Sequence, residues 1–460
     1  MATRTAQREV LMLAHFFPPL GGGGVQRTSK FVKYLPDFGW TPVVVTVKES
    51  AYWVKDSSLE EDLPSGLHDA RTLSPSVFYL LKLLPGGGGL RKSAGSGGEV
   101  SAGGERSGAL FARLRKLSSF FLIPDQYVGW VPFAVSAGLR CMRERSISVL
   151  YSTSSPDSTH LAGLLLKRLT GRPWVADFRD PWTERLTFSP PTPLHLGLNR
   201  LMESRVVSCA DRVVCTSEET ARDFLKKYPR LPREKFVVIT NGFDPDDFGE
   251  EIPLREKFTV THTGNLTGRR NCFDFLEGLR TFLEKKPEAR QRTEVLLMGP
   301  RDSENELRSE ELGLADIVVF GDTLPHKESV RLQLSSHLLL LMEHHSRRGA
   351  LIYPAKVFEY AASGRAVLAL VPEGPAARFV RNVCAGTVIS TPNPAAVFEA
   401  LSRFFDAYEA GSPIGGPKDR SALVSYERPA LARQLAGQLD LLHGVDPRSS
   451  SSANPLKNMA

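Results

Sequence analysis

Short apolar runs alternate with amphipathic segments along most of the chain. Residues 10–14 and 42–47 are apolar and partly β-branched, and residues 26–35 between them have the spacing of a helix. A strand, a helix and a second strand in this order favour a parallel sheet. The alternation continues with strands at 147–152, 174–177 and 212–215 and helices at 159–169 and 198–209. The first half of the chain is therefore predicted to be a doubly wound α/β domain.

The same alternation starts again after a turn and an acidic segment. Asn241 and Gly242 form a turn pair, and residues 244–253 are acidic and contain prolines, as is typical of an interdomain linker. Beyond them, predicted strands at 258–263, 294–298, 317–320, 337–342, 366–371 and 386–389 alternate with predicted helices. These elements predict a second doubly wound α/β domain.

Composition shifts set the predicted domain limits. Residues 85–108 are rich in glycine and serine and hold few apolar side chains, so we expect a flexible insertion there. The predicted order is a first domain at 1–243, a linker at 244–256, a second domain at 257–425, a last helix at 426–445 and a disordered tail at 446–460.

The overall composition is that of an ordinary globular protein, because 42% of the 460 residues are hydrophobic and 24% are charged. Its five cysteines form no C-x-x-C pair, which argues against a disulfide framework and a zinc cluster and favours a reducing compartment. Every apolar run is too short to span a bilayer. The net charge of +7 suits several kinds of anion, but no nucleic-acid-binding motif accompanies it. We expect a cytoplasmic protein without a nucleic-acid partner.

A glycine-rich loop at residues 21–24 follows the first predicted strand and precedes a helix. The dinucleotide fingerprint G-x-G-x-x-G is incomplete, because Arg27 stands where its third glycine would be. No P-loop occurs either, so neither a dehydrogenase nor a P-loop NTPase is indicated. Gly23 and Gly24 could still present main-chain N–H groups to an anion, or the loop could be only a tight turn.

Three segments together carry a family resemblance. They are FFPPLGGGGVQR at 16–27, VVITNGFD at 237–244 and PAKVFEYAASGRAVLAL at 354–370. Their order and spacing resemble the retaining, nucleotide-sugar-dependent glycosyltransferases of family 4, and the likeness covers nearly the whole chain. The resemblance implies the GT-B fold, in which two Rossmann-like domains face a cleft and a C-terminal helix crosses back to the first domain. It also implies transfer of a sugar from a nucleoside diphosphate to a hydroxyl of a cell-surface glycan or lipid-linked intermediate, with no metal or other cofactor.

The third segment resembles the donor site of that family. Glu359 matches the second glutamate of a paired-glutamate motif, which implies that it binds the ribose hydroxyls; the alternative is a helix salt bridge. The first glutamate of the pair is replaced by Leu351, and Glu343 or nearby main chain could compensate. Lys356 is a candidate phosphate contact, with a solvated lysine as the alternative. Pro354 is predicted to lie just inside the helix start.

Residues 261–271, THTGNLTGRRN, resemble the family's diphosphate-binding glycine loop. Gly264 is its glycine, Arg270 aligns with the family's lysine, and Asn265 stands where the family usually has an arginine, for which Arg269 could substitute. A leaving diphosphate gains negative charge, and an arginine fork can offset that charge without a metal. The alternative is a basic surface turn.

The first domain holds the candidate catalytic residues. WVADFRDPW, at 174–182, places Asp177, Arg179 and Asp180 where a strand ends, the edge at which open α/β sheets bind ligands. A carboxylate there could accept the proton of an acceptor hydroxyl. An Arg–Asp structural pair is the alternative. His160 is a candidate acceptor-side residue or a structural one.

A membrane surface is a further candidate partner. Residues 77–84 and 110–123 mix apolar side chains with Arg113, Arg115 and Lys116, which favours contact with anionic lipids at the inner face of the cell membrane. Two other functions stay open. One is a nucleotide-sugar 2-epimerase, which shares the fold, and the other is a catalytically degenerate homologue that only binds partners, as the loss of the first glutamate suggests.

Overall fold

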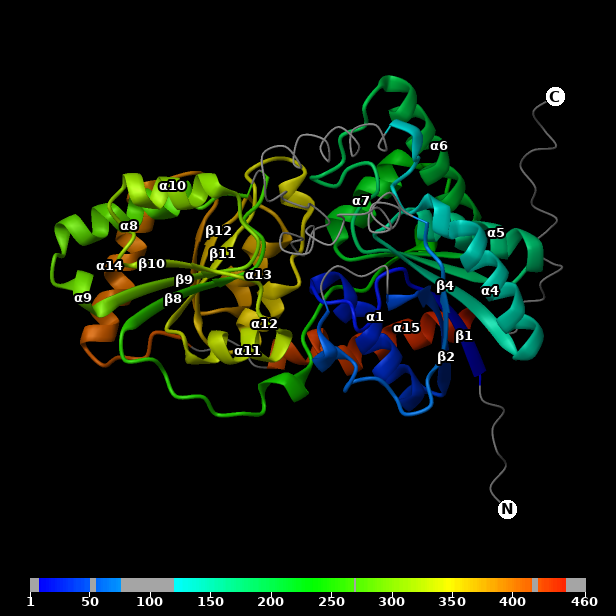
Figure 1. Cartoon of the computed structure of the whole chain (residues 1–460), viewed down its shortest axis with the longest axis horizontal. Coiled ribbons are helices and arrows are strands. Elements are labelled where there is room, and N and C mark those ends of the chain that lie inside the picture. Colours follow the sequence, from blue (N-terminus) through cyan, green and yellow to red (C-terminus); the bar gives the residue numbers. More distant parts are fainter. Residues whose placement is uncertain (1–7, 50–54, 76–119, 269, 416–420, 444–460) are drawn as a thin grey trace, which may run out of the picture. The chain divides into compact units, whose positions relative to one another are not determined.

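The computed structural model describes residues 8–49, 55–75, 120–268, 270–415 and 421–443. The insertion at 85–108, Arg113, Arg115, Lys116 and Arg269 lie outside these ranges. The chain forms two compact units (Figure 1). The first includes the chain up to Thr240 and again from Leu431, and the second is Asn241–Ala430.

The first unit is built on a seven-stranded parallel sheet in the order β3-β2-β1-β4-β5-β6-β7. Its strands are β1 (Arg8–Leu13), β2 (Trp40–Val47), β3 (His68–Thr72), β4 (Ile147–Ser154), β5 (Trp174–Phe178), β6 (Arg212–Cys215) and β7 (Phe236–Val238). Its helices are α1 (Gly23–Tyr34), α4 (Val131–Glu144), α5 (Ser158–Thr170), α6 (Pro193–Cys209), α7 (Glu218–Lys227) and most of α15 (Arg428–Leu442).

Side chains of β1 alternate between two buried layers. Leu11 and Leu13 pack with residues of α4 to α7, while Val10 and Met12 pack with α1 and α15 on the opposite face. This is the two-residue period of a strand covered on both faces, and it explains the continuous apolar run in the sequence. With both faces covered, the loops at the carboxyl ends of the strands are the positions left for a ligand.

Helix α15 completes the core of the first unit. Its Leu431, Leu435 and Leu439, four residues apart, are buried against the face of the sheet that holds Val10 and Met12. The predicted last helix therefore packs with the first unit.

The second unit is built on a six-stranded parallel sheet in the order β10-β9-β8-β11-β12-β13. Its strands are β8 (Phe258–Thr263), β9 (Thr293–Met298), β10 (Val318–Gly321), β11 (Leu338–Met342), β12 (Ala366–Leu370) and β13 (Gly386–Ile389). Its helices are α8 (Phe273–Lys285), α9 (Ala289–Arg292), α10 (Ser303–Glu311), α11 (His326–Ser335), α12 (Lys356–Ala362), α13 (Pro375–Val383) and α14 (Pro394–Glu409). Two doubly wound α/β units were predicted, and this prediction is confirmed.

Some elements had no counterpart in the sequence prediction. Helix α4 is the clearest case, because the side it buries carries small residues such as Ala134, Ala137 and Gly138. Such residues give a weak apolar period, so the helix is not evident from the pattern. Among the described helices, none is long and apolar enough to cross a membrane.

Candidate functional site

The predicted donor residues of the second unit lie close together at the carboxyl edge of its sheet. Gly264 follows β8 and Glu343 follows the neighbouring strand β11, while Lys356 begins α12. Gly264 has a φ of +153°, and a Cβ built on it would lie 1.7 Å from Lys356 Nζ. Only glycine leaves room for the ammonium group there.

Arg270 is held by Glu343. Arg270 Nε donates to Glu343 Oε2 at 2.6 Å, and the glutamate side chain is only 4% exposed. Among the described residues nothing accepts a hydrogen bond from the two terminal nitrogens of Arg270, so these donors are available to a ligand. Glu343 thus fixes one edge of the guanidinium and leaves the other open.

Lys356 adds positive charge that no neighbour fully offsets. Among the described residues its Nζ has no hydrogen bond or ion pair, and burial lowers the pKa of the ammonium group to about 8. Buried His262, on β8, faces the same space: Nδ1 is bonded to the carbonyl of Leu340 at 2.7 Å and Nε2 has no partner. Burial, with the nearby charge of Lys356, holds the pKa of His262 well below its usual value. This arrangement suits an anion.

Glu359 lies one turn beyond Lys356 on α12. The residue is 9% exposed, and no described residue donates a hydrogen bond to its carboxylate. Pro354 was predicted inside the helix start, and this is wrong: α12 begins two residues later and has seven residues. With so short a helix, an anion here depends on side chains such as Lys356 rather than on a helix dipole. Leu351 ends a 3₁₀ turn.

Asn265 has a local role in the glycine loop. Its Oδ1 accepts a hydrogen bond from the main-chain N–H of Thr267 at 2.9 Å, which closes a turn. The position that holds an arginine in the resembling family therefore stabilises the loop in this chain. The candidate substitute, Arg269, is outside the described residues.

In the first unit, Asp177 is fully buried at the end of β5. Arg27 donates to both of its carboxylate oxygens, from Nε at 2.8 Å and Nη2 at 2.9 Å, and Tyr151 donates its hydroxyl at 2.5 Å. The carboxylate is therefore engaged in an interior network. Sequence reasoning missed Arg27 and Tyr151 as its partners; the arginine at the third glycine position of the fingerprint was the available signal.

Arg179 and Asp180 lie nearer the surface at the same strand end. Arg179 Nη1 donates to the carbonyl of Gly24 at 2.8 Å, and a Cβ on that glycine would lie 2.6 Å from it. Asp180 is 3.6 Å from Arg179 Nε, and its side chain is 40% exposed. Of the two candidate carboxylates, Asp180 is thus the one that solvent reaches. Gly23 is the first residue of α1.

His160 is buried on α5. Its Nδ1 is 2.8 Å from Ser152 Oγ, its ring packs on Phe178, and Nε2 has no partner. Burial lowers its pKa to about 3, so the ring is neutral at physiological pH. Nearby Asp157 is also buried, is paired with Arg185 and has a pKa raised by burial to about 7.

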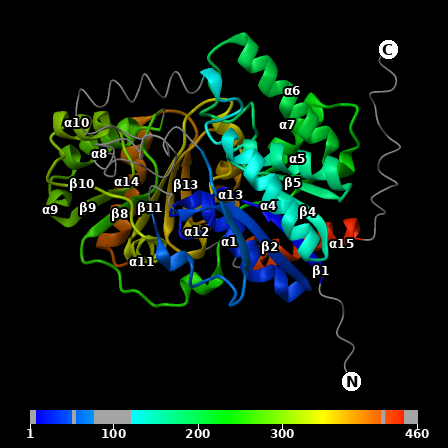
Figure 2. The ribbon, with the colours of Figure 1, turned by 45° about the vertical axis from the view of Figure 1, so that its right-hand side comes forward.

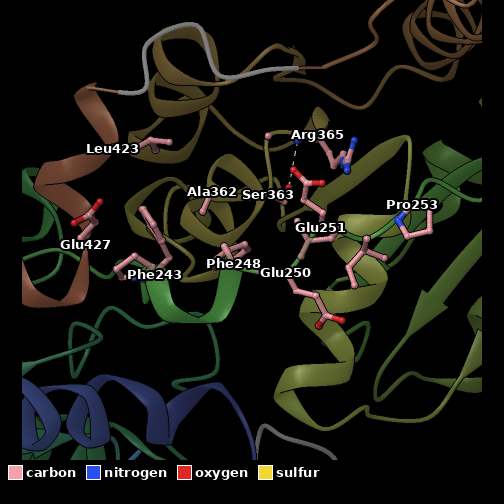
Figure 3. A pocket seen from close by; sticks show the side chains of 14 residues that line it. Phe243, Phe248, Glu250, Glu251, Pro253, Ala362, Ser363, Arg365, Leu423 and Glu427 are labelled. Carbon is pink, nitrogen blue, oxygen red and sulfur yellow. Dashed lines mark hydrogen bonds between the residues drawn. The ribbon is translucent and has the colours of Figure 1, made fainter.

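A cavity of about 820 Å³ lies elsewhere in the second unit (Figure 3). Phe243 and Phe248 form part of its wall, and Ser363 to Arg365, just before β12, form another part. The cavity is therefore at the amino edge of the sheet, opposite the Gly264 and Lys356 group. The cavity is therefore separate from the candidate donor site.

Residues 95–247 match the model of Glycosyltransferase Family 4. Over these residues the chain is similar to Glycosyltransferase Family 4. A search of curated proteins finds no match. The match includes the predicted catalytic positions Asp177, Arg179 and Asp180 but ends before the residues that surround Lys356.

Solved structures resemble nearly the whole chain. HepE of Anabaena in complex with UDP-glucose is 14% identical, with 94% of this chain and 99% of that chain covered and a TM-score of 0.59. Sucrose-phosphate synthase from Thermosynechococcus elongatus is 14% identical, with 95% and 100% covered and a TM-score of 0.61. A putative UDP-N-acetylglucosamine 2-epimerase from Listeria monocytogenes is 11% identical, with 94% and 95% covered and a TM-score of 0.52. These likenesses confirm the predicted GT-B fold and, at such identities, show the fold alone.

Proposed function

We propose that this protein is a retaining glycosyltransferase that moves a sugar from a nucleoside diphosphate to a hydroxyl acceptor. The observation that carries the proposal is the group of Lys356, Arg270 and Glu359 at the carboxyl edge of the second sheet. Two cationic side chains with free donors and a carboxylate without a partner are the groups needed for a diphosphate and a ribose, respectively.

The chemistry follows from these charges. When the glycosidic bond breaks, negative charge builds on the leaving diphosphate, and Lys356 with the open edge of Arg270 stabilises it. Arg270 is held for this task by Glu343. Because the cations come from the protein, we expect transfer without a metal or other cofactor, and activity should persist in a chelator.

The first unit supplies the acceptor side in this proposal. Asp180 is the candidate proton acceptor, because its carboxylate is exposed, whereas Asp177 is committed to Arg27. In a retaining transfer the acceptor approaches the same face of the sugar that the diphosphate leaves. The leaving phosphate is therefore the alternative to Asp180 as the group that takes the proton of the acceptor hydroxyl. Arg179 then positions Asp180 and the carbonyl of Gly24.

The acceptor we propose is a cell-surface glycan or its lipid-linked intermediate. Such acceptors are built at the cytoplasmic face of a membrane, so we propose a cytoplasmic protein that associates with the membrane surface. The net charge of +7 favours an anionic surface.

Binding of nucleotides tests the donor site directly. UDP and UDP-glucose, the ligands named for the HepE structures, are the first probes, followed by the other nucleoside diphosphates. Calorimetry should show selective binding by the wild type, loss in a Lys356→Met and Arg270→Ala double variant, and wild-type affinity in Arg280→Ala, an exposed residue of α8. If none of the nucleoside diphosphates binds, the proposal is refuted.

Product analysis separates transfer from epimerisation. The epimerase likeness makes this comparison necessary, since both reactions use the same fold. A transferase consumes the sugar nucleotide only when an acceptor is present, whereas a 2-epimerase changes the sugar without one. Chromatography of the products with and without acceptor decides between them.

A further inference from the structure

Helix α6 places its leucines on the outside of the first unit. Leu194, Leu198 and Leu201 are 69%, 36% and 52% exposed. Spacings of four and three residues put them on one side of the helix as an apolar stripe. A surface helix ordinarily turns such a stripe toward the sheet that it covers, whereas these three leucines face outward.

Three polar residues on the buried side of α6 are hydrogen-bonded to other parts of the unit, while Val206 and Val207 are buried further along the helix and Leu196 and Met202 pack partly against the core. Asn199 Oδ1 accepts a hydrogen bond from Trp182 Nε1 at 2.9 Å. Glu203 Oε2 accepts the main-chain N–H of Thr183 at 2.9 Å, and His195 is bonded through both ring nitrogens. Turning the leucines inward would leave these buried groups unpaired, which is costly. The outward leucines are therefore a fixed property of the fold.

The neighbouring elements extend the apolar surface. Helices α4, α5 and α6 lie side by side (Figure 2). On α5, Leu165 and Leu169 are exposed, and a groove of about 470 Å³ between α4 and α5 has mainly apolar walls. Phe120 packs its ring on His195 at the start of α6, and the adjacent Phe121 is 70% exposed. We call this surface the α4–α6 face.

Charge on these helices is strongly one-sided. Their basic residues are Arg140, Arg143, Lys167, Arg168, Arg200 and Arg205, and their acidic residues are Glu144 and Glu203. Glu203 is buried and bonded within the unit, so the exposed charge is almost entirely positive. A second copy of the chain would bring like charges together. An anionic surface is complementary.

We propose that the α4–α6 face docks on a membrane surface that contains anionic lipids. The leucines and phenylalanines enter the boundary between headgroups and acyl chains, and the arginines stay among the headgroups. The α4–α6 face would thus supply the membrane contact proposed above. The inference rests on the proposed membrane association and is independent of the donor site.

Co-sedimentation of the full chain with vesicles tests the inference. Vesicles of phosphatidylcholine alone are compared with vesicles that also contain phosphatidylglycerol, at low and high salt. We expect binding to the anionic vesicles that weakens with salt, because attraction between exposed charges is screened. A Leu198→Glu and Leu201→Glu double variant should bind at least tenfold more weakly. Leu307→Glu, at an equally exposed leucine of α10, is the control and should bind as the wild type does.

Folding and donor binding are measured in parallel. Circular dichroism verifies that the variants are folded, and should the leucine variant unfold, Arg200→Glu with Arg205→Glu changes only exposed side chains. Equal pelleting with neutral and anionic vesicles would overturn the inference. So would a loss of vesicle binding in the Leu307→Glu control as large as that in the leucine double variant. A concentration-dependent dimer that the leucine variant abolishes would assign the face to a second copy instead. Vesicle binding without binding of any nucleoside diphosphate would refute the donor site and leave the docking face intact.

Discussion

The ammonium group of Lys356 occupies the space into which a side chain at position 264 would project. A Cβ on Gly264 would lie 1.7 Å from Lys356 Nζ and 3.4 Å from His262 Nε2. The glycine therefore does more than permit a turn: it leaves room for a desolvated cation beside a neutral imidazole.

Gly264→Ala should weaken binding of a nucleoside diphosphate much more than it destabilises the fold. The new methyl group displaces the end of a flexible lysine, which can move, but the cation then leaves the site; a φ of +153° adds some backbone strain. Gly268→Ala is the matched control in the same loop, since its φ of +67° also strains an alanine but a Cβ there has no neighbour within 4 Å. Calorimetry and thermal melting of both variants provide the comparison, and equal losses of affinity would contradict the assigned role.

Lys356→Met should stabilise the free protein at neutral pH while it abolishes diphosphate binding. Burial lowers the pKa of Lys356 from 10.5 to about 8, so between these values the unfolded chain binds more protons and stability rises with pH. Removing the amine should gain at most about 3 kcal/mol at pH 7, with the gain disappearing by pH 10.5. Urea unfolding across this pH range measures it. A variant that is less stable at pH 7 would show that the charge is well paired.

Glu359→Gln should weaken binding of the cognate nucleotide by roughly 1–3 kcal/mol, because an amide replaces a charged acceptor of ribose hydroxyls. The variant should lose much less affinity for inorganic diphosphate, which has no ribose. Glu399→Gln, at an exposed glutamate of α14, is the control. An unchanged dissociation constant in a folded Glu359→Gln variant would refute the ribose role.

Arg270→Ala should lower kcat more than it weakens binding of the nucleoside, because its charge acts on the departing diphosphate. Glu343→Gln should reproduce part of this loss, since the amide holds the guanidinium less firmly. Arg269→Ala is the companion variant. Steady-state kinetics separate kcat from KM, and wild-type turnover in all three variants would place the diphosphate elsewhere.

Asp177→Asn should destabilise the first unit by about 3–5 kcal/mol, because it leaves the buried charge of Arg27 without a counter-ion. Asp180→Asn, at the exposed carboxylate three residues further along the chain, should leave stability nearly unchanged and reduce transfer. Chemical denaturation and an activity assay of both variants test this division. If Asp177→Asn remains as stable as the wild type, the hydrogen bonds among Asp177, Arg27 and Tyr151 do not contribute to the stability of the first unit.

The sequence by itself determined the two α/β units. Periods of two and 3.6 residues are properties of local backbone geometry, so short β-branched runs such as 42–47 and 258–263 identify strands before any contact is known. The loops after parallel strands indicate the sheet edge where ligands bind. Gly264 and Lys356 in particular were named from the family resemblance of residues 261–271 and 354–370.

Only the tertiary structure decided which charges pair. Asp177, a candidate catalytic residue, instead binds Arg27, 150 residues away, and Glu343 holds Arg270 across 73 residues. The rotation of α6 is of the same kind, because its hydrogen bonds reach other elements and force its leucines outward. Such pairs depend on which strands become neighbours and on which groups lose contact with water. Both are set by the packing of the whole unit rather than by spacing along the chain.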